Sequence, residues 1–159
     1  MTLAHGRQYL AIPGPSVMPD RVLRAMHRAA PNIYHGELVE MVPTIVRDLK
    51  AVARTGHHVA MYVANGHGAW EAALSNVFSR GDKVLALATG RFTIGWSDMA
   101  RKMGIDVEIM DFGRRSDIDM ARVAERLAGD EGHEIKGILC VQVDTATSVL
   151  NDIPALRKT

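Results

Sequence analysis

Residues 64–69, with the sequence ANGHGA, form a glycine-rich turn between an apolar run and a helix-like pattern. Such a turn presents backbone N–H groups at the positive end of a helix dipole, and glycines let that backbone approach an anion closely. The turn therefore indicates a phosphate site, with a generic tight turn as the alternative. The dinucleotide pattern G-x-G-x-x-G would need glycine where Glu71 stands, and the G-K-[ST] of triphosphate-binding loops is absent, which disfavours an unrelated nucleotide-binding domain.

Two further segments place aromatic and hydroxyl side chains where predicted strands end. The sequence TGRF occupies 89–92, and DTATS occupies 144–148. In open α/β sheets, ligands lie beyond the carboxyl ends of the strands. Phe92 and Thr145 are therefore candidates for contact with a ligand, while a core phenylalanine and an ordinary polar loop are the alternatives.

The segments that must hold these residues alternate between strand-like and helix-like patterns. Apolar runs with the composition of buried strands lie at 59–64, 83–88, 106–112 and 136–143. Apolar residues at helical spacing predict helices at 20–30, 38–52, 70–77, 96–103, 120–127 and from 153 onward. This alternation predicts an α/β fold with a mostly parallel sheet and helices on both faces.

Polar residues and a proline mark the expected helix boundaries. Asp20 is expected to cap the first helix, and Ser116 with Asp119 forms a capping-box-like pair. Pro43 predicts that the second helix either begins near Val42 or bends there.

Composition excludes several classes of protein. The 159 residues are 47% apolar and 23% charged, the balance of a globular domain, and the net charge of +1 gives no basis for binding nucleic acid or an anionic membrane. No apolar run approaches the roughly 20 residues of a membrane span. The single cysteine, Cys140, cannot form an internal disulfide, which favours a reducing compartment, and we expect a cytoplasmic protein. The histidines outside the turn lack metal-ligand spacing, so no metal site is expected.

The run NGHGAWEAALSN at 65–76, followed by GDKVL at 81–85, resembles the phosphate-binding signature of class V aminotransferases. These enzymes have fold type I and depend on pyridoxal 5′-phosphate, and the resemblance is nearest the alanine/serine–glyoxylate branch. It implies that Gly66, His67 and Gly68 hold the cofactor phosphate. A histidine at a helix N-terminus without any ligand is the alternative for His67.

The resemblance extends to the other two segments and to the N-terminal arm. It implies that Phe92 stacks on the cofactor's pyridine ring and that Thr145 hydrogen-bonds its phenolic oxygen. The family often has glycine where Ser148 stands and histidine where Gln142 stands, so both positions depart from the pattern. Gly14, in the sequence IPGPS of the arm, is expected to be a weak contact of the substrate carboxylate.

A complete family member transfers an amino group between a small amino acid (serine or alanine) and a 2-oxo acid (glyoxylate or pyruvate), usually as a homodimer. Its Schiff-base lysine lies, in the family, beyond the last residue here, so none of the lysines of this chain is assigned as catalytic. The resemblance therefore implies an N-terminal arm at 1–18 and a partial cofactor-binding large domain at 19–159 that is inactive alone. A non-catalytic phosphate- or anion-binding α/β domain is the alternative.

Overall fold

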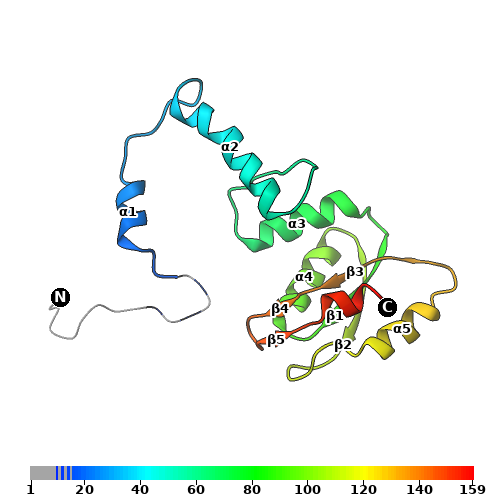
Figure 1. Cartoon of the computed structure of the whole chain (residues 1–159). Coiled ribbons are helices and arrows are strands. Elements are labelled where there is room, and N and C mark those ends of the chain that lie inside the picture. The colour runs from blue at the N-terminus through cyan, green and yellow to red at the C-terminus, as the bar shows by residue number, and fades with distance from the viewer. Residues whose placement is uncertain (1–9, 11, 13, 15) are drawn as a thin grey trace, which may run out of the picture. The chain divides into compact units, whose positions relative to one another are not determined.

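The computed structural model describes residues 10, 12, 14 and 16–159. The chain divides into two units, one extending to Met61 and the other running from Tyr62 to Thr159 (Figure 1). Pro13 and Pro15 of the expected arm lie outside the described residues. The domain boundary after residue 18 stays a prediction.

The first unit contains two helices, α1 (Asp20–Met26) and α2 (Glu37–Val52). Helix α1 ends before the expected Ala30, and its N-cap is Pro19, with Asp20 in the first turn; the expected cap at Asp20 is therefore wrong. Helix α2 begins well before Pro43 and continues through it. Neither helix buries a residue.

The second unit is built on a parallel sheet. Strand β1 (Lys83–Ala88) lies between β2 (Asp106–Asp111) and β3 (Ile135–Cys140), in the order β2-β1-β3. Both pairings of β1 are parallel. Strand β3 stops earlier than the predicted residue 143, because Val143 belongs to a separate hairpin of β4 (Val143–Asp144) and β5 (Val149–Leu150).

Helices cover both faces of this sheet, as the alternating pattern predicted (Figure 1). Helices α3 (Gly66–Val77) and α4 (Arg91–Lys102) contribute to a cluster with Val84 and Ala86. Helices α5 (Met120–Ala128) and α6 (Ile153–Leu156) contribute to a cluster with Leu85 and Leu87. Successive side chains of β1 point to opposite faces, so each face receives alternate residues of that strand.

The predicted strand at 59–64 is wrong. None of these residues is in a strand, and Tyr62 and Val63 are exposed. A strand needs a hydrogen-bonded neighbour, and within the described residues β1, β2 and β3 pair only with one another. Apolar composition predicts where a chain can form a strand, but it does not supply the partner.

The expected pairing of Ser116 with Asp119 at the start of α5 is also wrong. Asp119 is itself the N-cap, and its side chain accepts hydrogen bonds from the N–H groups of Ala121 and Arg122. Ser116 is exposed and lies outside the helix. A single aspartate thus satisfies two of the N–H groups that the helix start leaves open.

Candidate functional site

The glycine-rich turn begins helix α3, and Asn65 is its N-cap. The Asn65 side-chain oxygen accepts the N–H of His67 at 3.0 Å, and its carbonyl accepts the N–H of Gly68 at 3.0 Å. The N–H of Gly66 has no partner among the described residues. An anion at this turn therefore meets the free Gly66 N–H and the exposed His67 side chain, and it competes with Asn65 for the His67 N–H.

The two glycines of the turn have different surroundings. A Cβ added to Gly66 would meet no atom within 4 Å, so the backbone at this position faces open space. A Cβ added to Gly68 would collide with the Cβ of Ala64. Glycine at position 68 lets the turn close, whereas glycine at position 66 leaves room for a ligand beside the backbone.

An aromatic cluster joins the start of α3 to the start of α4. The His67 ring lies 4.8 Å from Trp70 and 6.3 Å from Phe92, measured between centroids. Trp70 meets Phe92 edge to face at 5.9 Å and stacks on Trp96 at 5.4 Å. The glycine-rich turn and the predicted stacking residue, Phe92, are thus side by side.

Trp96 forms the inner end of this cluster and packs against the core of the unit. Its indole nitrogen is buried and has no hydrogen-bond partner in the described structure. Phe92 is only half-buried, so its ring is partly accessible from solvent. A ring that is held by neighbours on one side and open on another can receive a flat ligand.

Asp144 connects the start of α4 to the β4–β5 hairpin. This side chain is fully buried. One carboxyl oxygen accepts the N–H of Phe92 at 2.8 Å, and the other accepts the N–H of Ala146 at 2.9 Å. The residue next in the chain, Thr145, is exposed, and its hydroxyl has no partner among the described residues. The structure therefore brings Thr145 near Phe92 through a shared neighbour.

Buried and half-buried polar side chains connect the hairpin to the residue that follows β1. The Thr147 hydroxyl donates to the carbonyl of Thr89 at 3.2 Å, and the Asn151 amide donates to the Thr89 hydroxyl at 2.9 Å. Ser148 has a φ of 61°, in the left-handed region that favours glycine. This conformation gives a physical reason for the glycine that the family often has at this position.

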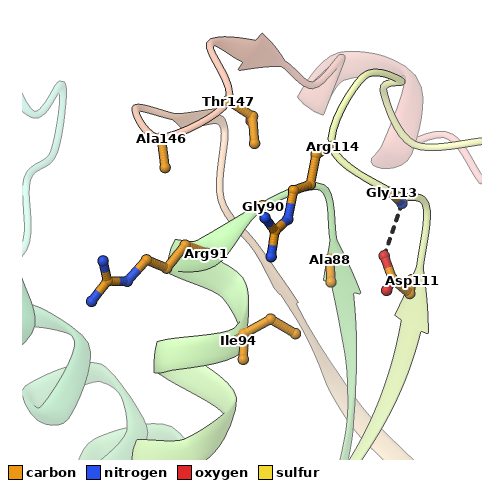
Figure 2. Close-up of a pocket in the computed structure, with 9 residues that line it drawn as sticks. All are labelled: Ala88, Gly90, Arg91, Ile94, Asp111, Gly113, Arg114, Ala146 and Thr147. Carbon is orange, nitrogen blue, oxygen red and sulfur yellow. Dashed lines mark hydrogen bonds between the residues drawn. The ribbon is translucent and has the colours of Figure 1, made fainter.

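A cavity of about 390 Å³ opens at the carboxyl ends of β1 and β2 (Figure 2). Its lining includes Gly90, Asp111, Arg114 and Thr147. In Figure 2 the Arg114 side chain extends toward the other lining residues, whereas that of Arg91 runs away from them. None of the residues predicted to bind the cofactor lines this cavity, so it is a neighbour of the candidate site and not the site itself.

The opposite end of the sheet carries an ion-pair network. Arg126 binds Glu108 through two of its nitrogens, one of them 2.7 Å from the carboxylate, and Lys83 lies 3.4 Å from the same residue. The Arg126 guanidinium holds the pKa of Glu108 below its usual range. Lys136 donates to the carbonyl of His133. Both lysines start strands of a parallel sheet, so they lie away from the carboxyl ends where the predicted site residues gather.

Cys140 ends strand β3 and is half-buried. Burial raises the pKa of its thiol to about 11, which keeps it protonated at neutral pH. It therefore behaves as a small apolar side chain and not as a nucleophile.

The predicted site residues divide into two sets. Gly66, His67 and Gly68 start α3, close to Phe92 at the start of α4, and Thr145 follows Asp144, which accepts the Phe92 N–H. Gly14 lies in the first unit, is exposed and has a φ of 145°; its role as a substrate contact stays a prediction.

Sequence reasoning missed Asn65 and Asp144. Asn65 could have been found from the preference of helix starts for asparagine. Asp144 had no comparable signal, because its bond to Phe92 joins residues 52 apart in the chain.

Membrane-spanning helices and clusters of metal ligands are both absent from the described residues. Within the described ranges, no helix is long and apolar enough to cross a membrane. The same residues contain no group of three or more histidine, cysteine, aspartate or glutamate side chains that could hold a metal ion.

Curated relatives match almost the whole chain. Serine–glyoxylate aminotransferase of Methylorubrum extorquens is 38% identical over 154 residues, which cover 96% of this chain and 38% of that protein. The enzyme of the same name from Arabidopsis thaliana is 34% identical, with 96% and 38% covered. L-aspartate–glyoxylate aminotransferase of Paracoccus denitrificans is 35% identical, with 92% and 37% covered. The chain thus spans well under half the length of these relatives. No family model matches it.

Solved structures agree with the fold. An aspartate aminotransferase of subgroup IV from Thermus thermophilus superposes with a TM-score of 0.82 at 26% identity, over 95% of this chain and 41% of that one. Alanine–glyoxylate aminotransferase from Nostoc sp. gives a TM-score of 0.78 at 22% identity, over 99% and 45%. The predicted fold class, part of fold type I with a mostly parallel sheet, is confirmed.

Proposed function

Because this chain resembles the N-terminal part of class V aminotransferases of the serine/alanine–glyoxylate group, we propose that it forms the phosphate-binding and ring-binding half of a pyridoxal phosphate site. The observation that carries the proposal is the approach of the His67 ring to within 6.3 Å of the Phe92 ring at the adjoining starts of two helices. A hydrogen-bond donor for a phosphate and a flat apolar surface for a ring then lie close enough to contact one small molecule.

The α3 turn would hold the phosphate. The Gly66 N–H is free, the space beside Gly66 is open, and His67 is exposed at the positive end of the helix dipole. Gly68 shapes the turn by letting it pass close to Ala64. These donors fit an anion, and no acidic side chain lies in the first turn of α3 to oppose it.

Phe92 and Thr145 would hold the ring. Phe92 offers a half-buried aromatic face, and Thr145 offers an exposed hydroxyl that no described residue uses. A ring lying against Phe92 would be oriented by a hydrogen bond from Thr145 to its phenolic oxygen. Pyridoxal phosphate supplies, when bound, an electron-withdrawing ring that stabilises negative charge at the substrate Cα.

The reaction we propose for the complete enzyme is amino transfer from serine or alanine to glyoxylate or pyruvate, in a homodimer located in the cytoplasm. The curated relatives named above support the substrate class. The low net charge and the lone cysteine support the absence of a nucleic-acid partner and the location. Gly14 would approach the substrate carboxylate.

The binding site is tested by titrating the chain with pyridoxamine 5′-phosphate, which has no aldehyde and cannot react with lysines. The chain's two tryptophans, Trp70 and Trp96, belong to the aromatic cluster, so binding should quench their fluorescence. Pyridoxamine without phosphate is the control. Equal affinity for both compounds would refute the phosphate role of the turn.

A non-catalytic anion-binding domain is the second candidate. The open backbone at Gly66 is compatible with either candidate. It predicts that inorganic phosphate binds as tightly as pyridoxamine 5′-phosphate, because the ring would then add nothing. A preference for the ring-bearing compound decides for the cofactor site.

A further inference from the structure

The carboxyl group of Asp144 is fully buried between two segments that each carry a proposed ring contact. It accepts the N–H of Phe92 at 2.8 Å from one side and the N–H of Ala146 at 2.9 Å from the other. Thr145 lies between Asp144 and Ala146 in the chain. One side chain thus sets the start of α4 against the hairpin loop.

Gly90 makes this approach feasible. It is the buried N-cap of α4 and has no side chain with which to cap the helix. A Cβ at this position would collide with the carboxyl group of Asp144. The helix start therefore receives its capping acceptor from Asp144, and an acidic group there also suits the helix dipole.

The main chain of Asp144 fixes the same loop a second time. Its carbonyl accepts the N–H of Ser148 at 2.7 Å and that of Thr147 at 3.2 Å. Three of the four residues of the loop 145–148 therefore donate a backbone N–H to Asp144. Thr145 has an exposed hydroxyl and lies between Asp144 and the three residues that donate to it.

We propose that Asp144 is a positioning residue of the cofactor site: it fixes the Thr145 hydroxyl relative to the Phe92 ring, so that one flat ligand meets both. This inference rests on the proposed function. Asp144 is buried behind the two contacts and acts through them, without touching the ligand.

The α3 turn has no hydrogen bond to Asp144 among the described residues. Loss of the Asp144 bonds should therefore weaken recognition of the ring and spare recognition of the phosphate. Loss of a side chain needed only for folding would instead weaken recognition of the ring and of the phosphate alike.

The test compares Asp144→Asn and Gly90→Ala in the full chain, with pyridoxamine 5′-phosphate and inorganic phosphate as probes. Asp144→Asn exchanges one accepting oxygen for an NH₂ group, and Gly90→Ala displaces the carboxyl group from outside. Asp111→Asn is the matched control, because Asp111 also accepts a backbone N–H at a strand end but is exposed. Near-UV circular dichroism of the stacked tryptophans reports whether each variant keeps its packing.

We expect both variants to bind pyridoxamine 5′-phosphate about tenfold more weakly, the effect of one lost hydrogen bond, and inorganic phosphate within about twofold of the parent chain. The double variant should be no worse than either single one, because both act on the same carboxyl group. The control should bind like the parent.

Unchanged ring affinity in Asp144→Asn, equal losses for both probes, or loss of the near-UV signal in both variants would overturn the positioning role. Failure of the parent chain itself to bind pyridoxamine 5′-phosphate would overturn the proposed function, and this inference with it. Binding by the parent chain therefore distinguishes failure of the positioning role from failure of the proposed function.

Discussion

Replacing Asn65 by aspartate should separate the stability of helix α3 from anion binding at its start. Aspartate caps a helix about as well as asparagine, and its charge suits the helix dipole, so the melting temperature should stay the same or rise. The same charge would lie beside the bound phosphate, because Asn65 Oδ1 is 3.0 Å from the His67 nitrogen that an anion would compete for.

The magnitude follows from the exposure of this turn. Two unit charges about 4 Å apart in water interact with about 1 kcal/mol. A phosphate ester carries nearly two charges at neutral pH, so the repulsion is about 2 kcal/mol. That corresponds to roughly 30-fold weaker binding.

The assay titrates pyridoxamine 5′-phosphate into the parent chain, Asn65→Asp and Asn65→Ser, following tryptophan fluorescence. Serine keeps a neutral cap, so Asn65→Ser should bind far more tightly than Asn65→Asp. Thermal unfolding of the unliganded proteins checks that each cap holds. If Asn65→Asp bound the compound as tightly as the parent chain, the phosphate would not lie at this turn.

Ser148→Gly should raise the free energy of unfolding by about 1 kcal/mol, because it relieves a left-handed backbone at a φ of 61°. Urea unfolding measures it, and a lower midpoint would contradict the reasoning. Leu87→Ala should cost about 2–5 kcal/mol in the same assay, because Leu87 is fully buried; Leu150→Ala, at a residue 63% exposed, is the control. Arg126→Gln should destabilise the fold at neutral pH, because Arg126 lowers the pKa of Glu108. Because the pKa of Glu108 is lowered in the folded protein, its carboxylate stabilises the fold at pH values above the ordinary pKa of 4.5. This contribution is lost as the pH falls through the folded-state pKa. The unfolding free energies of the two proteins should therefore converge in acid. A difference that persisted there would exclude this ion pair as its source.

The sequence was sufficient for a strand whose apolar pattern matches the neighbours that the fold supplies. The run KVLALA predicts a strand at 83–88, and β1 has those bounds. It is paired on both edges, by β2 and β3, and covered on both faces by helices, so local pattern and tertiary packing agree. The run at 59–64 has the same apolar texture but no neighbour to pair with among the described strands. The difference lies in the partner, which composition does not encode.

The candidate site divides in the same way. The α3 turn was predicted because its glycines and its helix are contiguous in the sequence, although its capping residue, Asn65, was missed. The link between Phe92 and Asp144 was not, since nothing in TGRF or DTATS states that the two segments share a hydrogen bond. Gly90 illustrates the reason. Its φ of 175° is extended backbone that any residue can adopt, so the backbone does not require glycine. Glycine is needed because a Cβ would collide with the side chain of Asp144, which is distant in the sequence.

The two parts of the site should therefore respond differently to substitution. Under the proposed function, phosphate recognition would depend on a helix start that closes within 64–68, so its loss should remain local and should occur without loss of stability. Ring recognition would depend on a buried carboxyl group that joins a helix to a hairpin, so substitutions there should change geometry at a distance. A ligand that carries both a phosphate and a ring should contact both parts, so comparing its affinity with that of inorganic phosphate would identify which part a given substitution has damaged.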